Sequence, residues 1–127
     1  MTKIWIARAL QALVVLFMLF DSSIKLVKIQ PVIDAFTTLG YDPSQARLIG
    51  SIELICTLLY LVPRTAVLGA VLLTGIFGGA IASHLRLDDP LFTHTLFGLY
   101  LGGMMWAPLF LRDARLRQLL PLTARAA

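Results

Sequence analysis

The chain is poor in charged residues and in cysteine. Only 14% of its 127 residues are charged, whereas 58% are hydrophobic; a soluble domain carries about a quarter charged residues. This composition excludes an ordinary soluble domain and indicates a membrane protein. Cys56 is the single cysteine, so an intrachain disulfide and a CxxC redox pair are both excluded. Quinone chemistry by a dithiol is excluded with them.

Several sequence motifs that are diagnostic of a particular catalytic or binding function are also missing. The sequence has no phosphate-binding loop, no dinucleotide fingerprint and no Ser-His-Asp set, so we predict no catalytic residue. It lacks HExxH, CxxC and paired histidine spacing, and we predict no metal site. Haem ligation by His84 and His94 is disfavoured because both histidines flank one short loop. The net charge of +4 predicts no nucleic-acid partner, because in so apolar a chain its distribution matters more than its sum.

Long apolar segments are what the chain does have. A membrane-spanning helix needs about 20 mostly apolar residues to cross a core of about 30 Å, and four such segments run approximately over 4–28, 46–62, 65–84 and 91–111. They predict an all-α fold, a transmembrane antiparallel four-helix bundle that forms one domain over 1–127, with a basic tail at 112–127. A cleavable signal peptide is disfavoured for the first segment, because the residues around Phe20 lack the small-residue cleavage pattern.

The longest connection between these segments contains its own helix signal. Pro31 interrupts the chain after the first segment. We expect a short helix after it, with Val32, Phe36 and Leu39 against the bilayer surface. Ser44 precedes the second long segment, where its hydroxyl is predicted to cap the helix.

Turn and glycine patterns predict how the helices pack. The tight turn at Pro63 makes the second and third segments antiparallel neighbours. Gly75 and Gly79 form a GxxxG pattern in the third segment, and Gly98 and Gly102 repeat it in the fourth. Small residues at this spacing let helix backbones approach closely in a membrane, so we interpret them as packing positions.

Basic residues are distributed unequally between the two ends of the predicted bundle. With four crossings, the end that carries both termini holds Lys3, Arg8, Arg64, Arg112, Arg115, Arg117 and Arg125. The opposite end holds Lys25, Lys28, Arg47 and Arg86, diluted by four aspartates. Because basic residues concentrate on the cytoplasmic side, we predict a multi-pass protein of the bacterial inner membrane with both termini in the cytoplasm.

Five ionisable residues fall in or at the ends of the apolar segments, all near the outer face. They are Asp21, Lys25, Glu53, His84 and His94. A charge at bilayer depth costs several kcal/mol unless it is paired or wetted, so such residues mark candidate functional sites. We predict that these five form an outward-facing polar pocket that binds a ligand or handles protons.

Glu53 is the strongest candidate within this group. It lies six residues beyond Arg47, or about 9 Å deeper along a helix. Lys25 can pair with Asp21 one turn away, with Glu53 across helices, or with both. The cluster is then either a structural ion-pair network or a proton-handling site, since burial and a nearby lysine act on a carboxylate in opposite directions.

The order of short motifs along the chain resembles that of a known family. The motifs are Lys25, Leu39-Gly40, Pro43, Leu48, Gly50, Glu53, Leu61-Val62-Pro63-Arg64, Gly69-Ala70, Gly79-Ala80 and His84. This order is similar to that of the DoxX-like family of small four-helix membrane proteins. The resemblance implies an inner-membrane bundle whose polar end holds the lysine, glutamate and histidine. The family takes its name from a subunit of a quinone-linked thiosulfate oxidoreductase, and other members are tied to oxidative-stress complexes or to membrane-protein assembly.

Three functions are compatible with these observations. The first is a quinone- or lipid-facing subunit of a redox-associated complex, with no intrinsic cofactor, a bound quinone or lipid, and another membrane or redox protein or a homo-oligomer as partner. The second is a non-catalytic assembly factor or partner subunit that packs through its GxxxG faces. The third is a small proton-coupled transporter in which Glu53 exchanges protons for substrate.

Overall fold

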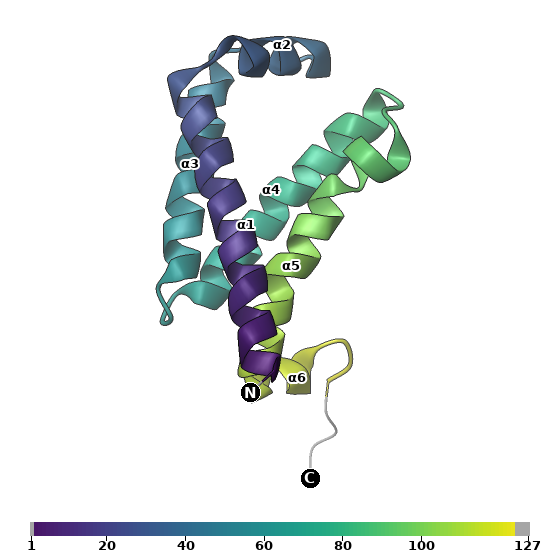
Figure 1. The fold of residues 1–127 in the computed structure, drawn as a ribbon. Coiled ribbons are helices and arrows are strands. Elements are labelled where there is room, and N and C mark those ends of the chain that lie inside the picture. The colour runs from purple at the N-terminus through teal and green to yellow at the C-terminus, as the bar shows by residue number, and fades with distance from the viewer. Residues whose placement is uncertain (1, 124–127) are drawn as a thin grey trace.

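The computed structural model describes residues 2–123, and all regular elements in that range are helices. Its elements are α1 (Thr2–Val27), α2 (Gln30–Leu39), α3 (Gln45–Leu61), α4 (Ala66–Arg86), the π-helical turn η1 (Leu91–Thr95), α5 (Phe97–Arg112) and α6 (Ala114–Leu119) (Figure 1). The predicted all-α class is confirmed. Arg125 of the predicted basic tail lies outside the described residues.

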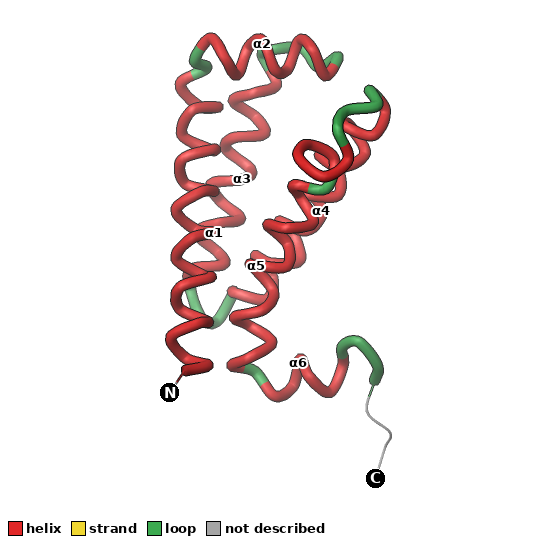
Figure 2. Tube along the Cα trace, turned by 45° about the vertical axis from the view of Figure 1, so that its right-hand side comes forward, coloured by secondary structure: helices red, strands yellow, loops and turns green. Residues whose placement is uncertain are grey.

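Four long helices form the body of the molecule. α1 and α4 each contact both α3 and α5, so the four helices close a ring in which neighbours run antiparallel. The α3–α4 pairing confirms the prediction from the tight turn at Pro63. In Figures 1 and 2, α1 and α3 lie side by side, whereas α4 and α5 lean away from them toward the end covered by α2. The ring is therefore wider at that end.

The surface of this ring is strongly apolar. Leu13, Leu16 and Phe20 of α1 are 57%, 65% and 63% exposed, and similar side chains cover α3, α4 and α5. α1 and α4 are long and apolar enough to cross a membrane, and α3 and α5 are slightly shorter, with 17 and 16 residues. Large apolar surfaces of this kind are normally covered by lipid or by protein.

All four predicted helices have somewhat different bounds in the structure, and the differences in the first and the fourth affect polar residues. α1 ends at Val27, and Lys28 adopts a left-handed conformation with φ of 59°. Lys28 therefore does not continue the helical face that Asp21 and Lys25 share on α1. The predicted fourth helix is divided, because the wide turn η1 precedes α5.

The apolar face of α2 lies against protein, which corrects the prediction that it lies on the bilayer surface. Val32 and Phe36 are only 6% and 7% exposed and pack with Ala46 of α3 and Ile24 of α1 in a small core. Leu39, the third residue of that predicted face, is half-buried. α2 crosses the ends of α1 and α3 (Figure 1), so it covers apolar side chains that those ends would otherwise expose.

The capping prediction for Ser44 is wrong in its chemistry. Ser44 occupies the N-cap position of α3, but its hydroxyl makes no capping hydrogen bond. Its φ and ψ of −61° and −25° are helical, whereas a side-chain cap normally needs an extended residue. Instead, the backbone N–H of Ser44 donates to Asp42 Oδ1 at 2.9 Å. This hydrogen bond holds the pKa of Asp42 below its ordinary value.

The predicted glycine packing holds for α5 and fails for α4. A Cβ on Gly98 would lie 2.9 Å from the Phe77 carbonyl oxygen, so α4 and α5 approach closely there. Gly102 makes only ordinary contact with the Phe77 ring. Gly75 and Gly79 have no described atom of another helix within 4 Å of a Cβ position. Their GxxxG pattern therefore does not pack helices within this chain.

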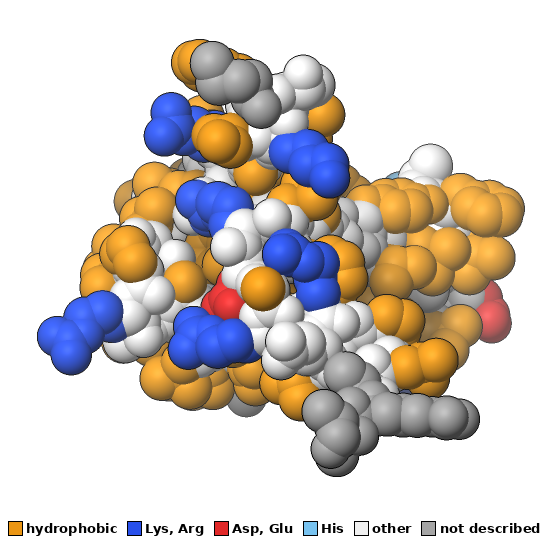
Figure 3. All heavy atoms as spheres, turned by 90° about the horizontal axis from the view of Figure 1, so that it is seen from below, with side chains coloured by type: hydrophobic (Ala, Val, Ile, Leu, Met, Phe, Trp, Pro, Cys, Tyr) orange, Lys and Arg blue, Asp and Glu red, His pale blue; other side chains and the backbone are white. Residues whose placement is uncertain are grey.

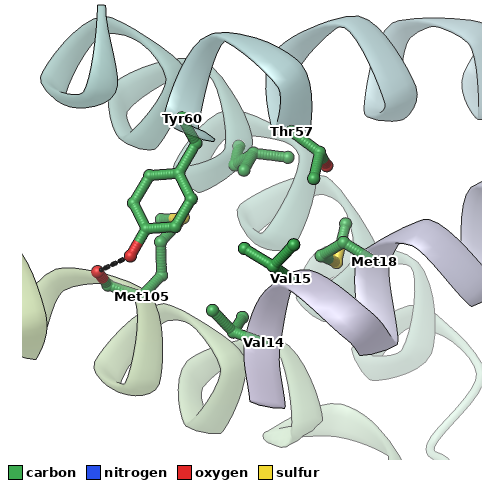
Figure 4. Close-up of a pocket in the computed structure, with 7 residues that line it drawn as sticks. Val14, Val15, Met18, Thr57, Tyr60 and Met105 are labelled. Carbon is green, nitrogen blue, oxygen red and sulfur yellow. Dashed lines mark hydrogen bonds between the residues drawn. The ribbon is translucent and has the colours of Figure 1, made fainter. Parts of the chain in front are cut away.

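A different glycine, Gly69, sets the close contact between α4 and α3. A Cβ there would collide with the Tyr60 backbone N–H and lie 2.8 Å from the Cys56 carbonyl oxygen. Next to this contact, Tyr60 Oη donates to the Met105 carbonyl at 2.7 Å (Figure 4). The side chains around this bond leave no space for a water molecule; they are Val14, Val15, Met18, Thr57, Tyr60, Leu73 and Met105. The middle of the ring is thus dry and closely packed.

Candidate functional site

A cavity of about 120 Å³ lies inside the wider end of the ring. Its lining comes from α1, α3, α4, η1 and α5: Phe17, Met18, Asp21, Lys25, Glu53, Ile76, Phe77, Ala80, His84, His94, Phe97, Gly98 and Leu101. All five ionisable residues singled out in the sequence line this one cavity. Whether they bind a ligand or move protons stays a prediction.

Local helix geometry brings the lysine and the glutamate together. Asp21 and Lys25 are four residues apart on α1 and so share a face. Across from them, Gly50 lets α3 come close, because a Cβ there would lie 2.8 Å from Lys25 Cβ and 3.0 Å from the Ser22 carbonyl oxygen. Glu53 follows Gly50 by three residues and therefore faces Lys25.

Lys25 pairs with both carboxylates at once. Its Nζ lies 2.6 Å from Asp21 Oδ2 and 2.5 Å from Glu53 Oε1. The Glu53 side chain is 3% exposed, while those of Lys25 and Asp21 are 17% and 26% exposed. Of the three pairings that the sequence left open, the structure has the shared one, with the glutamate at its buried end.

The second carboxylate oxygen of Glu53 is unsatisfied. Oε2 is buried and has no hydrogen-bond partner among the described residues. A buried acceptor left unmatched costs about 1–3 kcal/mol. One ammonium group can neutralise only one of the two carboxylates, and an uncompensated buried charge is costly. The cluster therefore has a place for one proton or for one hydrogen-bond donor from outside the chain.

The two histidines form the opposite polar edge of the cavity. His84 lies in the last turn of α4, and His94 lies in η1. Their rings meet edge to face, with centroids 6.0 Å apart. His84 Nδ1 lies 2.7 Å from Asp89 Oδ2. Asp89 was not predicted as a partner of His84. Its position just past the end of the helix that carries His84 is the signal that would have identified it.

The wide turn η1 determines where His94 lies. Its backbone hydrogen bonds run over five residues, from Thr95 N–H to the Pro90 carbonyl at 3.2 Å and from Leu96 N–H to the Leu91 carbonyl at 2.9 Å. Such π-helical turns are rare and occur often at functional sites. The turn brings His94 beside His84, next to the cavity.

Apolar side chains form the rest of the cavity wall. The rings of Phe17 and Phe97 meet edge to face with centroids 5.3 Å apart, and Phe77 and Leu101 are buried beside them. A polar edge and an aromatic wall in one cavity fit a ligand with a small polar head and an apolar body.

Contacts beyond the cavity tie the loop after α2 to the end of α4. Tyr41 Oη and Ser83 Oγ are 2.6 Å apart, and the Arg86 guanidinium donates to the Leu39 carbonyl. Tyr41 and Ser83 did not stand out in the sequence, because a tyrosine in a loop and a serine in an apolar helix are common. The contacts hold α2 across the wide end of the ring (Figure 2).

Comparison with known proteins identifies the family. The family model described as the DoxX-like family matches residues 9–108. The chain belongs to the DoxX-like family. The matched range contains all five ionisable residues of the DoxX-like cavity and ends before Asp113 and α6. Searches of the curated proteins and of the solved structures found no match. Family membership and the two apolar helices together indicate a membrane protein.

The side chains in the DoxX-like cavity suit acid–base chemistry. Within residues 2–123, no group of three or more His, Cys, Asp and Glu side chains could hold a metal ion. Carboxylates and imidazoles at the edge of a small cavity can accept, hold and donate protons. Cys56 is buried outside the cavity lining.

Proposed function

We propose that this DoxX-like protein is a quinone-binding subunit of a redox-associated membrane complex. The observation that carries the proposal is the unsatisfied, buried Oε2 of Glu53 at the edge of a cavity whose other walls are aromatic. A quinol hydroxyl matches this acceptor, and a ring matches the edges of Phe17 and Phe97. A quinone head also has the required shape, because it is small, planar and attached to an apolar tail.

The chain's role in such a complex is to bind the head and to supply protons. Reduction of a quinone to a quinol takes up two electrons and two protons. Glu53 and the two histidines are groups that can pass protons to the two ring oxygens. The electrons come from an electron-transferring partner protein, since carboxylates, imidazoles and a lone thiol do not supply them.

Charge supports an orientation of this complex in the bacterial inner membrane. Lys and Arg side chains gather on the end of the molecule where α1 begins and α5 ends (Figure 3). By the positive-inside rule this end faces the cytoplasm. All four long helices then cross the membrane, both termini are cytoplasmic, and the cavity opens toward the outer face.

Single cysteines test this topology, because Cys56 is the only native one. In a Cys56→Ser background, Asp34→Cys on α2 should react in intact cells with a maleimide that cannot cross the membrane. Arg117→Cys on α6 should react only after the membrane is opened. The same labelling pattern at both positions, or the reverse pattern, contradicts the orientation.

Quinone retention tests the function. The protein is purified in a mild detergent, and its lipids are extracted and quantified by mass spectrometry. The wild type should retain close to one quinone per chain, and Glu53→Gln should lose most of it. Asp34→Asn is the matched control, since it neutralises an exposed carboxylate that does not line the cavity. Failure of the wild type to retain quinone, or equal retention by both variants, argues against the proposal.

A second candidate function, that of a non-catalytic partner subunit, is favoured by one observation. Gly75 and Gly79 of α4 contact no other described helix, although small residues at this spacing commonly admit a neighbouring helix. A photoreactive amino acid at Leu72, which is exposed on the same helix, should cross-link another membrane protein in native membranes. Recovery of homo-oligomers alone would exclude this candidate.

A further inference from the structure

A second pocket lies at the opposite end of the molecule from the ionisable cavity. It has a volume of about 560 Å³ and lies between α1, the α3–α4 turn, the end of α5 and the start of α6. Its lining is Gln11, Tyr60, Leu61, Pro63, Ala66, Leu109, Arg112, Asp113 and Arg115. None of these residues takes part in the function proposed above.

An apolar groove adjoins this pocket. The groove has a volume of about 460 Å³ and is lined by Arg8, Gln11, Ala12, Val15, Leu16 and Leu61. Gln11 and Leu61 line both spaces, so the two adjoin each other. From Arg8 to Leu16 the groove follows α1 for eight residues away from the basic end, or about 12 Å. One end of the combined space is therefore polar and the other apolar.

The polar end is rich in arginine. Arg8, Arg112 and Arg115 line it together with one carboxylate, Asp113. That carboxylate is already paired with Arg115, at 2.9 Å. Arg112 instead donates to neutral oxygens, the Gln11 side chain at 2.7 Å and the Pro108 carbonyl at 3.3 Å. The pocket is thus electropositive, and Figure 3 shows basic side chains around this end.

The short helix α6 positions Arg115. Asp113 Oδ1 accepts from the Arg115 backbone N–H at 2.9 Å and begins the helix. Leu116 is buried against the core and anchors α6 to the end of α5. The helix α6 extends from the end of the bundle (Figure 2). A short basic helix in this position is expected at the level of the lipid headgroups.

We infer that this combined space, which we call the arginine pocket, is a binding site for an anionic phospholipid. The arginines contact the phosphate through charge-assisted hydrogen bonds, and one acyl chain follows Ala12, Val15 and Leu16 along α1. Basic pockets between helices at the headgroup level are a recurrent way to select anionic lipids. The inference does not depend on the quinone proposal or on which leaflet this end faces.

Native mass spectrometry of the delipidated protein in detergent tests the inference. Phosphatidylglycerol should bind at least tenfold more tightly than phosphatidylcholine of the same acyl chains. Arg112→Gln should weaken phosphatidylglycerol binding at least fivefold and leave phosphatidylcholine unchanged. Arg64→Gln is the matched control, because Arg64 follows Pro63 in the same turn but does not line the pocket. Equal affinity for the two lipids overturns the inference, and so does an equal loss in both variants.

Three further measurements separate a lipid from a free anion and keep the test independent of folding. Inorganic phosphate at millimolar concentration should not displace phosphatidylglycerol, and displacement would reassign the pocket to a soluble anion and overturn the inference. Ala12→Trp should fill the groove and weaken long-chain phosphatidylglycerol at least fivefold, but not its six-carbon-chain form. Loss of both forms, or of neither, contradicts an acyl-chain groove. Quinone retention by Arg112→Gln should match the wild type, so failure of either proposal can be recognised separately.

Discussion

The middle and the wide end of this DoxX-like bundle consist of the same four helices but differ in what lies between them. In the middle, Gly69 and the Tyr60–Met105 hydrogen bond hold the helices so closely that no water fits. At the wide end, Lys25 and Glu53 border a cavity. Close packing lowers the free energy of the fold, whereas an unsatisfied buried group raises it. The close packing of the middle therefore offsets the free-energy cost of the polar groups at the wide end.

The variant with the largest expected effect on stability removes Lys25, the cation of the wide end. Lys25→Met leaves Asp21 and Glu53 facing each other without a counter-charge, and we expect a loss of about 3 kcal/mol in unfolding free energy. Unfolding in mixed micelles of mild detergent and dodecyl sulfate measures it. The charge-free variant that combines Lys25→Met with Asp21→Asn and Glu53→Gln should recover most of the loss. A triple variant as unstable as the single one would mean that shape, not charge, holds this end together.

A smaller effect is expected from a methyl group placed in the middle. Gly69→Ala drives a Cβ into the backbone at Tyr60 and Cys56, and overpacking of this kind costs about 2 kcal/mol. Gly75→Ala is the matched control on the same helix; its Cβ meets no described atom of another helix, so alanine's higher helix propensity should give a gain of up to about 1 kcal/mol. The same unfolding assay applies. Equal effects at the two positions would contradict the packing difference.

The hydrogen bond in the middle should contribute less. Tyr60→Phe removes the donor to the Met105 carbonyl while keeping the ring, and we expect a loss of about 1 kcal/mol. Quinone retention should not change, because Tyr60 does not line the ionisable cavity. A variant with normal stability and impaired retention would show that the two regions are not separate in function.

The smallest effect concerns α6, outside the four long helices. Hydrogen bonds from the Arg115 side chain and backbone hold the pKa of Asp113 below its ordinary value. A carboxyl group whose pKa is lower in the folded state stabilises that state above its ordinary pKa, and this stabilisation is lost as the pH falls through the folded value. A spin label at Gln118→Cys, in the Cys56→Ser background, should therefore gain mobility only in strongly acidic buffer. Asp113→Asn should abolish this pH dependence, and its persistence in that variant would assign the transition to another group.

Much of this architecture could be predicted because apolar length and ionisable residues are strong signals in a membrane protein. Helix lengths followed from the thickness of the bilayer, and the alternation of chain direction brought Asp21, Lys25, Glu53, His84 and His94 to one end. That these five residues lie close together could therefore be predicted without knowing how the side chains pack.

The errors in helix packing concern which face of a helix contacts protein. A helix that is apolar all round gives no periodic contrast between lipid-facing and protein-facing sides. For this reason the sequence did not show which neighbour Gly75 and Gly79 of α4 pack against. The case of α2 is different: it is amphipathic, and an apolar face such as the one that carries Phe36 fits a bilayer surface as well as a protein neighbour. The arginine pocket was missed because the count of basic residues placed Arg8 and Arg112 at one end of the bundle but did not show that they line adjoining spaces.

The wide turn η1 has a consequence for insertions and deletions. An α-helix turns by about 100° per residue, so removing one residue between His94 and Phe97 would rotate His94 by about that angle relative to α5. The four long helices would keep their lengths and their contacts. Loss of a single codon here could thus separate His94 from His84 while leaving a DoxX-like fold intact.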